Sequence, residues 1–291
     1  MGTGIERVGV VGCGLMGSGI AEVCARAGLD VLVREVDDDR LAAGRRRIDT
    51  SLQRAVRAGK LDDDERLRAL DRLSFTTALG DLADRQLVVE AVVEEEAAKV
   101  AVFAELDRLV EDPDAVLASN TSSIPIMKLA MATRRPEAVV GMHFFNPVPV
   151  LRLVELVTSL LTGPETAERA EAFAAGTLGK HVIRSQDRAG FVVNALLIPY
   201  LLSAIRMMES GFATPEHIDE GMVLGCNHPM GPLALTDLIG LDTTMAVAES
   251  LYAEFREPLF APPPLLSRMV DAGLLGRKTG RGFYDYADRK A

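Results

Sequence analysis

The sequence has no tryptophan, and Phe and Tyr bring its aromatic content to only 5% of 291 residues. Platforms that stack single-stranded nucleic acid need several aromatic side chains, so this scarcity argues against that class of protein. Positive charge is also in the minority, because 32 Lys and Arg stand against 42 Asp and Glu for a net charge of −10. Such a surface disfavours general binding to nucleic acid or to an anionic membrane.

Cysteine is scarce as well. Cys13, Cys24 and Cys226 are too few and too scattered for a disulfide framework or a CxxC metal site, so we expect no metal. A reducing compartment, the cytoplasm, fits this usage best. We find no secretory signal and no unbroken apolar stretch of about 18 residues, so no membrane partner is expected. The 48% hydrophobic content is that of an ordinary globular chain with one large or two modest domains.

Strand-like and helical patterns alternate along much of the chain. Apolar runs at Arg7–Val11 and Asp30–Arg34 flank a helical stretch, and residues 37–70 read as a helical insertion. Further strand-like runs are expected at 75–76, 86–93, 115–118, 139–142, 153–157 and 181–184, and further helical stretches at 95–110, 126–132, 165–178, 191–210, 215–224 and 232–255. Continuous apolar strands that alternate with helices are typical of a parallel sheet.

A glycine-rich turn joins the first strand-like run to the helical stretch behind it. Its sequence is Gly12-Cys13-Gly14-Leu15-Met16-Gly17. The first glycine permits a tight turn, the second lets the backbone approach a pyrophosphate, and the third allows close packing of helix on strand. Because the turn follows a strand and opens a helix, it predicts a dinucleotide site in a Rossmann-type domain.

Glu35 stands at the end of the second strand-like run, 18 residues after Gly17. An acidic side chain there would bond the adenosine ribose hydroxyls and repel a 2′-phosphate, which favours NAD over NADP as cofactor. The neighbouring Arg34 weakens this preference slightly. The alternative is a plain glycine turn beside a solvated glutamate.

Strand patterns stop after Arg188, and the rest of the chain is helical apart from a Pro-rich break at 257–264. We therefore predict an α/β fold class, with a Rossmann-type, mostly parallel sheet and a helical insertion in residues 1–187. An all-α C-terminal domain is expected at residues 188–291. Both lengths lie in the usual range for domains.

His143 follows the strand-like run at 139–142 and is one of four histidines. In α/β folds, ligands bind at the carboxyl ends of strands. Glu155 lies twelve residues further on, inside an apolar run, where a buried carboxylate needs a partner and a histidine is an obvious one. The pair would orient the imidazole for acid–base catalysis, although a histidine taken alone is as readily structural.

Two further polar features have both a functional and a structural interpretation. The segment Ser119–Ser123 follows a strand-like run, and its hydroxyls and amide could bond a substrate oxygen or simply form a turn or helix cap. Asn194 lies in an apolar helical stretch, where its amide needs a partner that is either a ligand or another helix. Local sequence leaves both alternatives open.

Taken together, these pieces resemble the 3-hydroxyacyl-CoA dehydrogenase family, in particular its short bacterial 3-hydroxybutyryl-CoA members. The resemblance runs from about Arg7 to Tyr286. It is carried by the stretches GCGLMGSGIAE, VVEAVVEEEAAK, ASNTSS, GMHFFNPVPV, LVELV, GFVVNALLIPYL, HPMGPLALTDLIGLD and LGRKTGRGFYDY. Several independent matches in the right order are far more specific than the glycine motif alone.

The resemblance implies an NAD-dependent oxidoreductase that interconverts (S)-3-hydroxyacyl-CoA, of short chain such as 3-hydroxybutyryl, and 3-oxoacyl-CoA. It makes His143 the catalytic base and Glu155 its orienting partner. Ser122 would bond the substrate's 3-oxygen near the nicotinamide, and Asn194 would hold the acyl-CoA near its reacting carbonyl. The C-terminal domain would bind substrate and form a homodimer.

The same resemblance implies the binding residues. Residues that would contact the cofactor are Gly12, Gly14, Leu15, Met16, Gly17, Glu35, Glu94, Lys99, Ser122, Asn146 and Lys278. Family members contact CoA from the helical insertion through a serine and a lysine. Ser51 matches that serine, whereas Ala58 stands where the lysine is frequent, so Arg54, Arg57 or Lys60 would supply the charge.

Two other functions are weighed against this one. A related β-hydroxyacid dehydrogenase, for example one that oxidises gulonate, would share the fold and most of the motifs. A non-catalytic dinucleotide-binding protein would share the fold alone, since a fold does not establish activity. The intact set of His143, Glu155, Ser122 and Asn194 counts against the second alternative.

Overall fold

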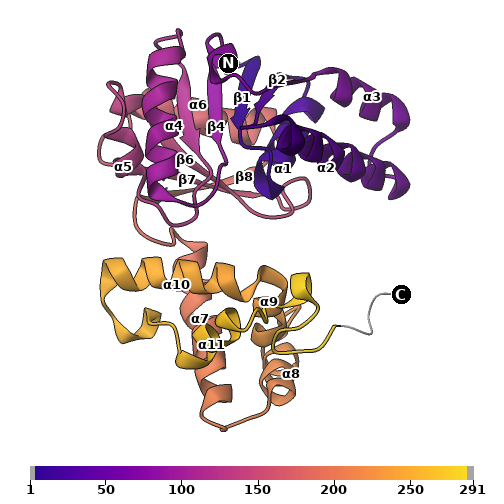
Figure 1. Ribbon diagram of the computed structural model, residues 1–291, viewed down its shortest axis with the longest axis vertical. Coiled ribbons are helices and arrows are strands. Elements are labelled where there is room, and N and C mark those ends of the chain that lie inside the picture. Colours follow the sequence, from indigo (N-terminus) through magenta and orange to yellow (C-terminus); the bar gives the residue numbers. More distant parts are fainter. Residues whose placement is uncertain (1–3, 287–291) are drawn as a thin grey trace. The chain divides into compact units, whose positions relative to one another are not determined.

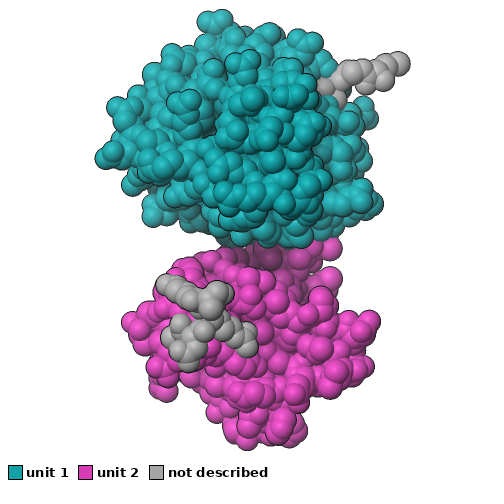
Figure 2. Space-filling view, turned by 90° about the vertical axis from the view of Figure 1, so that its right-hand side faces the viewer, with its two compact units in different colours: residues 1–188 teal, residues 189–291 magenta. Residues whose placement is uncertain are grey.

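The computed structural model describes residues 4–286 and divides the chain into two compact units. Unit 1 runs to Arg188 and unit 2 begins at Ala189, as the two colours of Figure 2 show. Among the helices within the described residues, none combines the length and apolar character that a membrane span requires.

Unit 1 is built on one sheet with helices packed against it (Figure 1). The strands are β1 (Arg7–Val11), β2 (Asp30–Arg34), β3 (Leu73–Thr76), β4 (Leu87–Glu90), β5 (Val116–Ser119), β6 (Val139–Phe144), β7 (Leu153–Thr158) and β8 (His181–Gln186). The helices are α1 (Leu15–Arg26), α2 (Asp38–Arg57), α3 (Asp63–Asp71), α4 (Glu96–Leu109), α5 (Ile126–Ala130) and α6 (Pro164–Ala172).

The described strands form an eight-stranded sheet in the order β3-β2-β1-β4-β5-β6-β7-β8. Neighbouring strands run parallel except β7, which is antiparallel to β6. The helical insertion is the pair α2 and α3, which packs against α1 (Figure 1). The predicted fold class, a Rossmann-type, mostly parallel sheet with a helical insertion, is confirmed.

Alternation along the strands builds the main core of unit 1. In β1 the side chains of Val8 and Val10 belong to one buried cluster, as do Val31 and Val33 of β2. Successive side chains of a strand point to opposite faces, so every second residue meets the same layer of helices. Ile48 of α2 lies in that cluster, which fixes the insertion to the sheet domain through apolar contact.

Several element boundaries differ from the predicted ones. The strand expected at 139–142 continues to Phe144, because β7 pairs with β6 as far as Val154. The helix expected at 165–178 ends at Ala172 and continues as a π-helical turn over Phe173–Thr177. The stretch expected to be helical over 232–255 is broken at Gly240, whose φ of 104° is outside the helical region.

Unit 2 is helical, as predicted for the C-terminal part of the chain. Its α-helices are α7 (Val193–Glu209), α8 (Pro215–Cys226), α9 (Pro232–Ile239), α10 (Leu241–Phe255) and α11 (Pro264–Asp271). Leu202, Leu233 and Leu251 lie in its own core cluster and are fully buried. The tail behind α11 is anchored by Asp237, which accepts hydrogen bonds from the backbone N–H of Phe283 at 2.9 Å and of Tyr284 at 3.0 Å.

Candidate active site

The register of unit 1 places the predicted site residues along one edge of the sheet. Val11 of β1 is opposite Glu90 of β4, Glu90 is opposite Ser119 of β5, and Ser119 is opposite Gly141 of β6. These four strands are parallel, so the segments that follow them leave the sheet on the same side. The glycine turn, Glu94, Ser122 and His143 therefore share the carboxyl edge of neighbouring strands.

The glycine turn has the close packing that the motif predicts. Gly12 has a φ of 95°, and a Cβ there would lie 2.6 Å from the carbonyl oxygen of Ala91. A Cβ on Gly17 would lie 1.8 Å from the carbonyl oxygen of Gly12, so neither position accepts a side chain. Around Gly14, the N-cap of α1, a Cβ would meet no atom within 4 Å. Backbone and space thus suit a phosphate at the helix N-terminus.

Glu35 turns its carboxylate toward the glycine turn. Its Oε1 accepts a hydrogen bond from the backbone N–H of Cys13 at 2.6 Å, and its Oε2 accepts one from Val36 at 3.1 Å. The guanidinium of Arg34 donates to the carbonyl oxygen of Thr77 at 3.2 Å. Arg34 is therefore engaged with backbone, and the carboxylate of Glu35 is the charged group held against the turn.

His143 and Glu155 form a buried pair across two antiparallel strands. They are direct partners in the register of β6 and β7, and the imidazole Nδ1 lies 2.7 Å from Oε2 of Glu155. His143 is 6% exposed and Glu155 is fully buried. A carboxylate can only accept, so Nδ1 carries a proton in this contact, which leaves Nε2 as the acceptor nitrogen of the neutral ring. Contrary to expectation, His143 lies inside a strand rather than after it, and the ladder fixes its geometry.

Glu94 sits over the loop that contains Ser122. Its Oε1 accepts hydrogen bonds from the hydroxyl of Thr121 at 2.6 Å, from the N–H of Ser122 at 2.8 Å and from the N–H of Ser123 at 3.2 Å. The hydroxyl of Ser122 donates to the same oxygen at 3.3 Å. Burial alone would raise the pKa of Glu94, but Lys99 and these donors bring it below its usual value.

Lys99 of α4 joins Glu94 to a second carboxylate beneath it. The ammonium lies 2.6 Å from Oε1 of Glu90 and 3.2 Å from Oε2 of Glu94. The hydroxyl of Ser119 donates to Oε2 of Glu90 at 2.6 Å. Glu90 was not among the predicted residues. A glutamate that ends an apolar strand, nine residues before a lysine, is the signal that would have found it.

Two predicted residues belong to unit 2. Asn194 lies in the first turn of α7 and is half-buried, because the helix begins at Val193 rather than at 191 as predicted. The amide is therefore at a helix start and not within a buried apolar helix. Lys278 pairs with Asp242, with 2.6 Å from its ammonium to Oδ1.

The remaining predicted residues lie in unit 1. Leu15 and Met16 follow Gly14 in the first turn of α1, Leu15 exposed and Met16 packed against the core. Asn146 is exposed in the loop between β6 and β7, two residues beyond the end of β6.

Of the predicted CoA contacts, Ser51 of α2 is half-buried, whereas Arg54 and Lys60 are exposed. Within residues 4–286, no cluster of three or more His, Cys, Asp or Glu side chains is arranged to hold a metal ion.

Comparison with known proteins gives the same family along the whole described chain. Residues 7–188 match the model of the 3-hydroxyacyl-CoA dehydrogenase NAD binding domain, and residues 190–286 match that of the C-terminal domain. The chain is 64% identical over 286 residues to a 3-hydroxybutyryl-CoA dehydrogenase of Mycobacterium tuberculosis, covering 98% of this chain and 100% of that protein.

Two solved structures are similar in fold and sequence. M. tuberculosis FadB2 has a TM-score of 0.96 and 65% identity, covering 97% of this chain and 99% of that one. The (S)-3-hydroxybutyryl-CoA dehydrogenase PaaH1 of Ralstonia eutropha has a TM-score of 0.92 and 46% identity, covering 98% and 100%. These likenesses extend over both units.

Proposed function

The chain belongs to the 3-hydroxyacyl-CoA dehydrogenase family, and from that premise we propose that it interconverts (S)-3-hydroxybutyryl-CoA and acetoacetyl-CoA with NAD as cofactor. The observation that carries the proposal is the buried contact of 2.7 Å between His143 and Glu155, held at the edge of the sheet that also carries the glycine turn. A bound nicotinamide ring supplies the hydride acceptor or donor.

His143 is the acid–base group of the proposed reaction. In the oxidative direction its Nε2 takes the proton of the 3-hydroxyl as the hydride leaves C3, and in reverse it returns that proton to the forming alkoxide. Glu155 accepts the hydrogen bond from Nδ1 in both directions. The carboxylate fixes the tautomer and stabilises the imidazolium that forms when Nε2 is protonated.

Ser122 orients the substrate's 3-oxygen in this proposal. Its hydroxyl donates to Glu94 over 3.3 Å, a long contact that can be exchanged for a bond to substrate. The N–H groups of Ser122 and Ser123 stay bonded to Glu94, which keeps the loop in place. Lys99, which is itself paired with Glu90, holds Glu94 from below.

The cofactor site is proposed to select NAD. A negative carboxylate at Glu35, fixed by the N–H of Cys13, would repel a 2′-phosphate. Arg34, the charge that could attract one, is bonded to Thr77 instead. Asn146 and Lys278 are proposed cofactor contacts and Asn194 a substrate contact, by their match to the family.

The test is the oxidation of NADH by acetoacetyl-CoA, followed as the loss of NADH absorbance. We expect turnover with NADH and a kcat/KM with NADPH at least roughly tenfold lower, because a repelled phosphate loses more than about 1.4 kcal/mol. The substitution Glu35→Gln should bring the kcat/KM with NADPH closer to that with NADH. No turnover of acetoacetyl-CoA with either cofactor would overturn the proposed function.

A homodimer formed through unit 2 and a place in the cytoplasm complete the proposal. Sedimentation of the full chain tests the first. The second rests on the free thiols of Cys13, Cys24 and Cys226, which fit a reducing compartment.

A further inference from the structure

The helical insertion packs directly against the glycine turn. Gly44 of α2 is buried, and a Cβ built there would lie 2.3 Å from Sγ and 2.6 Å from Cβ of Cys13. The side chain of Cys13 is fully buried and therefore occupies the space that a side chain at Gly44 would need. The lack of a side chain at Gly44 thus lets α2 contact the turn itself as well as α1, beside which it lies in Figure 1.

Arg47 adds a hydrogen bond to this contact, three residues further along α2. Its Nη1 donates to the carbonyl oxygen of Cys13 at 3.1 Å. Residues three apart on a helix are neighbours on its surface, so Gly44 and Arg47 both face the turn. Among residues 4–286 the guanidinium makes no ion pair, and this is the only hydrogen bond of its side chain. The backbone of the turn is therefore the one described partner of Arg47.

Cys13 is held by a second charged residue through its other peptide group. Its N–H donates to Oε1 of Glu35 at 2.6 Å, while its carbonyl oxygen accepts from Arg47. Burial raises the pKa of the Cys13 thiol to about 12, and Glu35 raises it further whereas Arg47 lowers it. Both charges thus lie close to this one residue, and each fixes one of the two peptide groups that flank it.

The hydrogen bond from Arg47 also sets the direction of the N–H of Gly14. In a planar trans peptide, the C=O of one residue and the N–H of the next point in opposite directions. With the carbonyl of Cys13 turned to Arg47, the N–H of Gly14 points away from α2. Within the described residues that N–H has no hydrogen-bond partner, and a Cβ on Gly14 would meet no atom within 4 Å. A donor on the carbonyl also polarises the peptide and strengthens its N–H as a donor.

We propose that Arg47 is a positioning residue for the diphosphate of the bound dinucleotide, because it holds the peptide between Cys13 and Gly14 with the N–H of Gly14 presented to a phosphate oxygen. This inference rests on the proposed function, which assigns the turn to a dinucleotide. The helical insertion is then part of the cofactor site. Glu35 distinguishes the two cofactors at the ribose, whereas Arg47 acts on the diphosphate that NAD and NADP share.

Steady-state kinetics of the full chain test this role. Arg47→Ala should raise KM for NADH and for NADPH by the same factor, roughly five- to tenfold, since one hydrogen bond from a charged group is lost. Both kcat and KM for acetoacetyl-CoA should change less than about twofold. Arg47→Lys keeps a charged donor and should recover part of the loss. The matched control is Arg46→Ala, an exposed neighbour with no ion pair or side-chain hydrogen bond to any described residue, which should change none of these values.

Other patterns in the same kinetics would overturn the proposal. A rise in KM for acetoacetyl-CoA alone would make Arg47 a substrate contact, and a rise for NADPH alone would make it a contact of the 2′-phosphate. An unchanged KM for both cofactors would leave Arg47 without a role in binding. A loss of kcat with no recovery in Arg47→Lys would mean that the residue only supports the fold.

Calorimetric binding of ADP-ribose, which carries the diphosphate without nicotinamide, tests the role of Arg47 without turnover. Its Kd should rise roughly five- to tenfold in Arg47→Ala and stay within about twofold in Arg46→Ala. If wild type and Arg47→Ala differed in this way but acetoacetyl-CoA were not turned over, the proposed function would fail while the role of Arg47 would hold. Equal Kd values for wild type and Arg47→Ala would overturn that role.

An exchange of volume tests the packing that brings Arg47 to the turn. Gly44→Ala should weaken ADP-ribose binding at least as much as Arg47→Ala, because the new Cβ would push α2 away from Cys13. The double variant Cys13→Gly/Gly44→Ala removes the side chain that clashes and should recover most of the affinity. If it bound ADP-ribose no more tightly than Gly44→Ala, the contact between α2 and the turn would not support cofactor binding, and the proposal would be overturned.

Discussion

The two units bury carboxylates in different ways. In unit 1, Glu155 faces His143 and Glu90 faces Lys99, so each buried carboxylate has a titratable or cationic partner. In unit 2, Asp237 is 1% exposed and accepts from the N–H of Phe283, the N–H of Tyr284 and the hydroxyl of Tyr286 at 3.0 Å. Those partners are neutral, and burial raises the pKa of Asp237.

This contrast distinguishes a carboxylate that can take part in catalysis from one that only holds the fold together. A carboxylate that is hydrogen-bonded to a histidine stabilises the imidazolium that forms when the histidine takes up a proton, so such a pair suits acid–base catalysis. A carboxylate bound by backbone N–H groups ties two segments together and has nothing to transfer. Asp237 fixes the tail of unit 2 to α9, whereas Glu155 fixes a side chain that we propose reacts.

The largest expected effect is the loss of kcat when His143, the partner of Glu155 in unit 1, is replaced. His143→Ala should lower kcat for acetoacetyl-CoA by about 10²–10⁴-fold, since that is the usual contribution of a positioned acid–base group. The thermal midpoint should change little in comparison. Steady-state NADH oxidation measures the effect, with the exposed His217→Ala as matched control. A kcat within threefold of wild type would remove His143 from the mechanism.

Lys99→Met tests the cationic pairing in unit 1. It would leave Glu90 fully buried without its counter-ion, and breaking a buried pair costs about 3–5 kcal/mol. Chemical denaturation of the full chain measures the free energy of unfolding. If Lys99→Met lost less than about 1 kcal/mol, the pairing would not be what stabilises these carboxylates. Lys128→Met, at an exposed pair with Glu96, is the control and should cost little.

Asp237→Asn tests the neutral pairing in unit 2 and should cost less. The amide cannot accept from all of its present donors, and leaving one unpaired costs about 1–3 kcal/mol. The exposed Asp271→Asn on α11 provides the comparison. Release of the tail should appear as faster amide exchange at Phe283 and Tyr284. Unchanged exchange there would contradict the anchoring role.

The smallest effect is a difference in pH dependence. Burial raises the pKa of Asp237 above its ordinary value of 3.8, so its contribution to stability is present at low pH and is lost as the pH rises from that value through the raised pKa. The pKa of Glu94 is lowered from 4.5, against its burial, by Lys99, Thr121 and Ser122, so its contribution is lost as pH falls below that value.

The free energy of unfolding, measured between pH 3 and 6 for wild type and for a variant of each carboxylate, should therefore give differences that depend on pH in opposite directions. The stability difference between wild type and Asp237→Asn should shrink as pH rises, and that between wild type and Glu94→Gln should grow. If both differences shrank as pH rises, burial would dominate at both carboxylates, and if both grew, charges and hydrogen bonds would dominate at both; either result would contradict the contrast.

The parts of the fold and of the candidate site that could be predicted are those that depend on residues close together in the sequence. The spacing of the glycines is enough to predict the glycine turn. Glu155 lies in an apolar run, where a carboxylate needs a partner, and this makes its pairing with His143 predictable. The predicted family and the Rossmann-type fold are confirmed. The sequence predicts that the strand ends before His143. In the structure β6 continues to Phe144, because β7 pairs with it there, and the sequence does not reveal that pairing.

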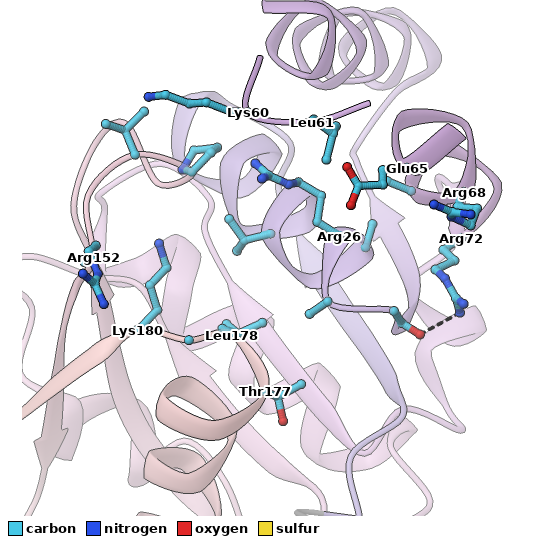
Figure 3. Close-up of a pocket in the computed structure, with 18 of the residues that line it drawn as sticks. Arg26, Lys60, Leu61, Glu65, Arg68, Arg72, Arg152, Thr177, Leu178 and Lys180 are labelled. Carbon is cyan, nitrogen blue, oxygen red and sulfur yellow. Dashed lines mark hydrogen bonds between the residues drawn. The ribbon is translucent and has the colours of Figure 1, made fainter. Parts of the chain in front are cut away.

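What the sequence could not supply depends on register and on distant segments. The sequence marks Glu90 as a carboxylate in an apolar run that needs a partner, but only the packing of α4 on the sheet shows that this partner is Lys99. A pocket of about 630 Å³ in unit 1 gathers Arg26, Arg68, Arg152 and Lys180 from four separate segments (Figure 3). No local sequence pattern joins these four residues.

The central claim is that Glu155 acts through His143, and a double-mutant cycle tests it most directly. The account predicts that Glu155→Gln alone lowers kcat for acetoacetyl-CoA by roughly 10–100-fold and that His143→Ala/Glu155→Gln is no slower than His143→Ala, because groups that act as a unit are not additive. If the second substitution instead lowered kcat by the same factor with and without His143, Glu155 would act independently and the account would be contradicted.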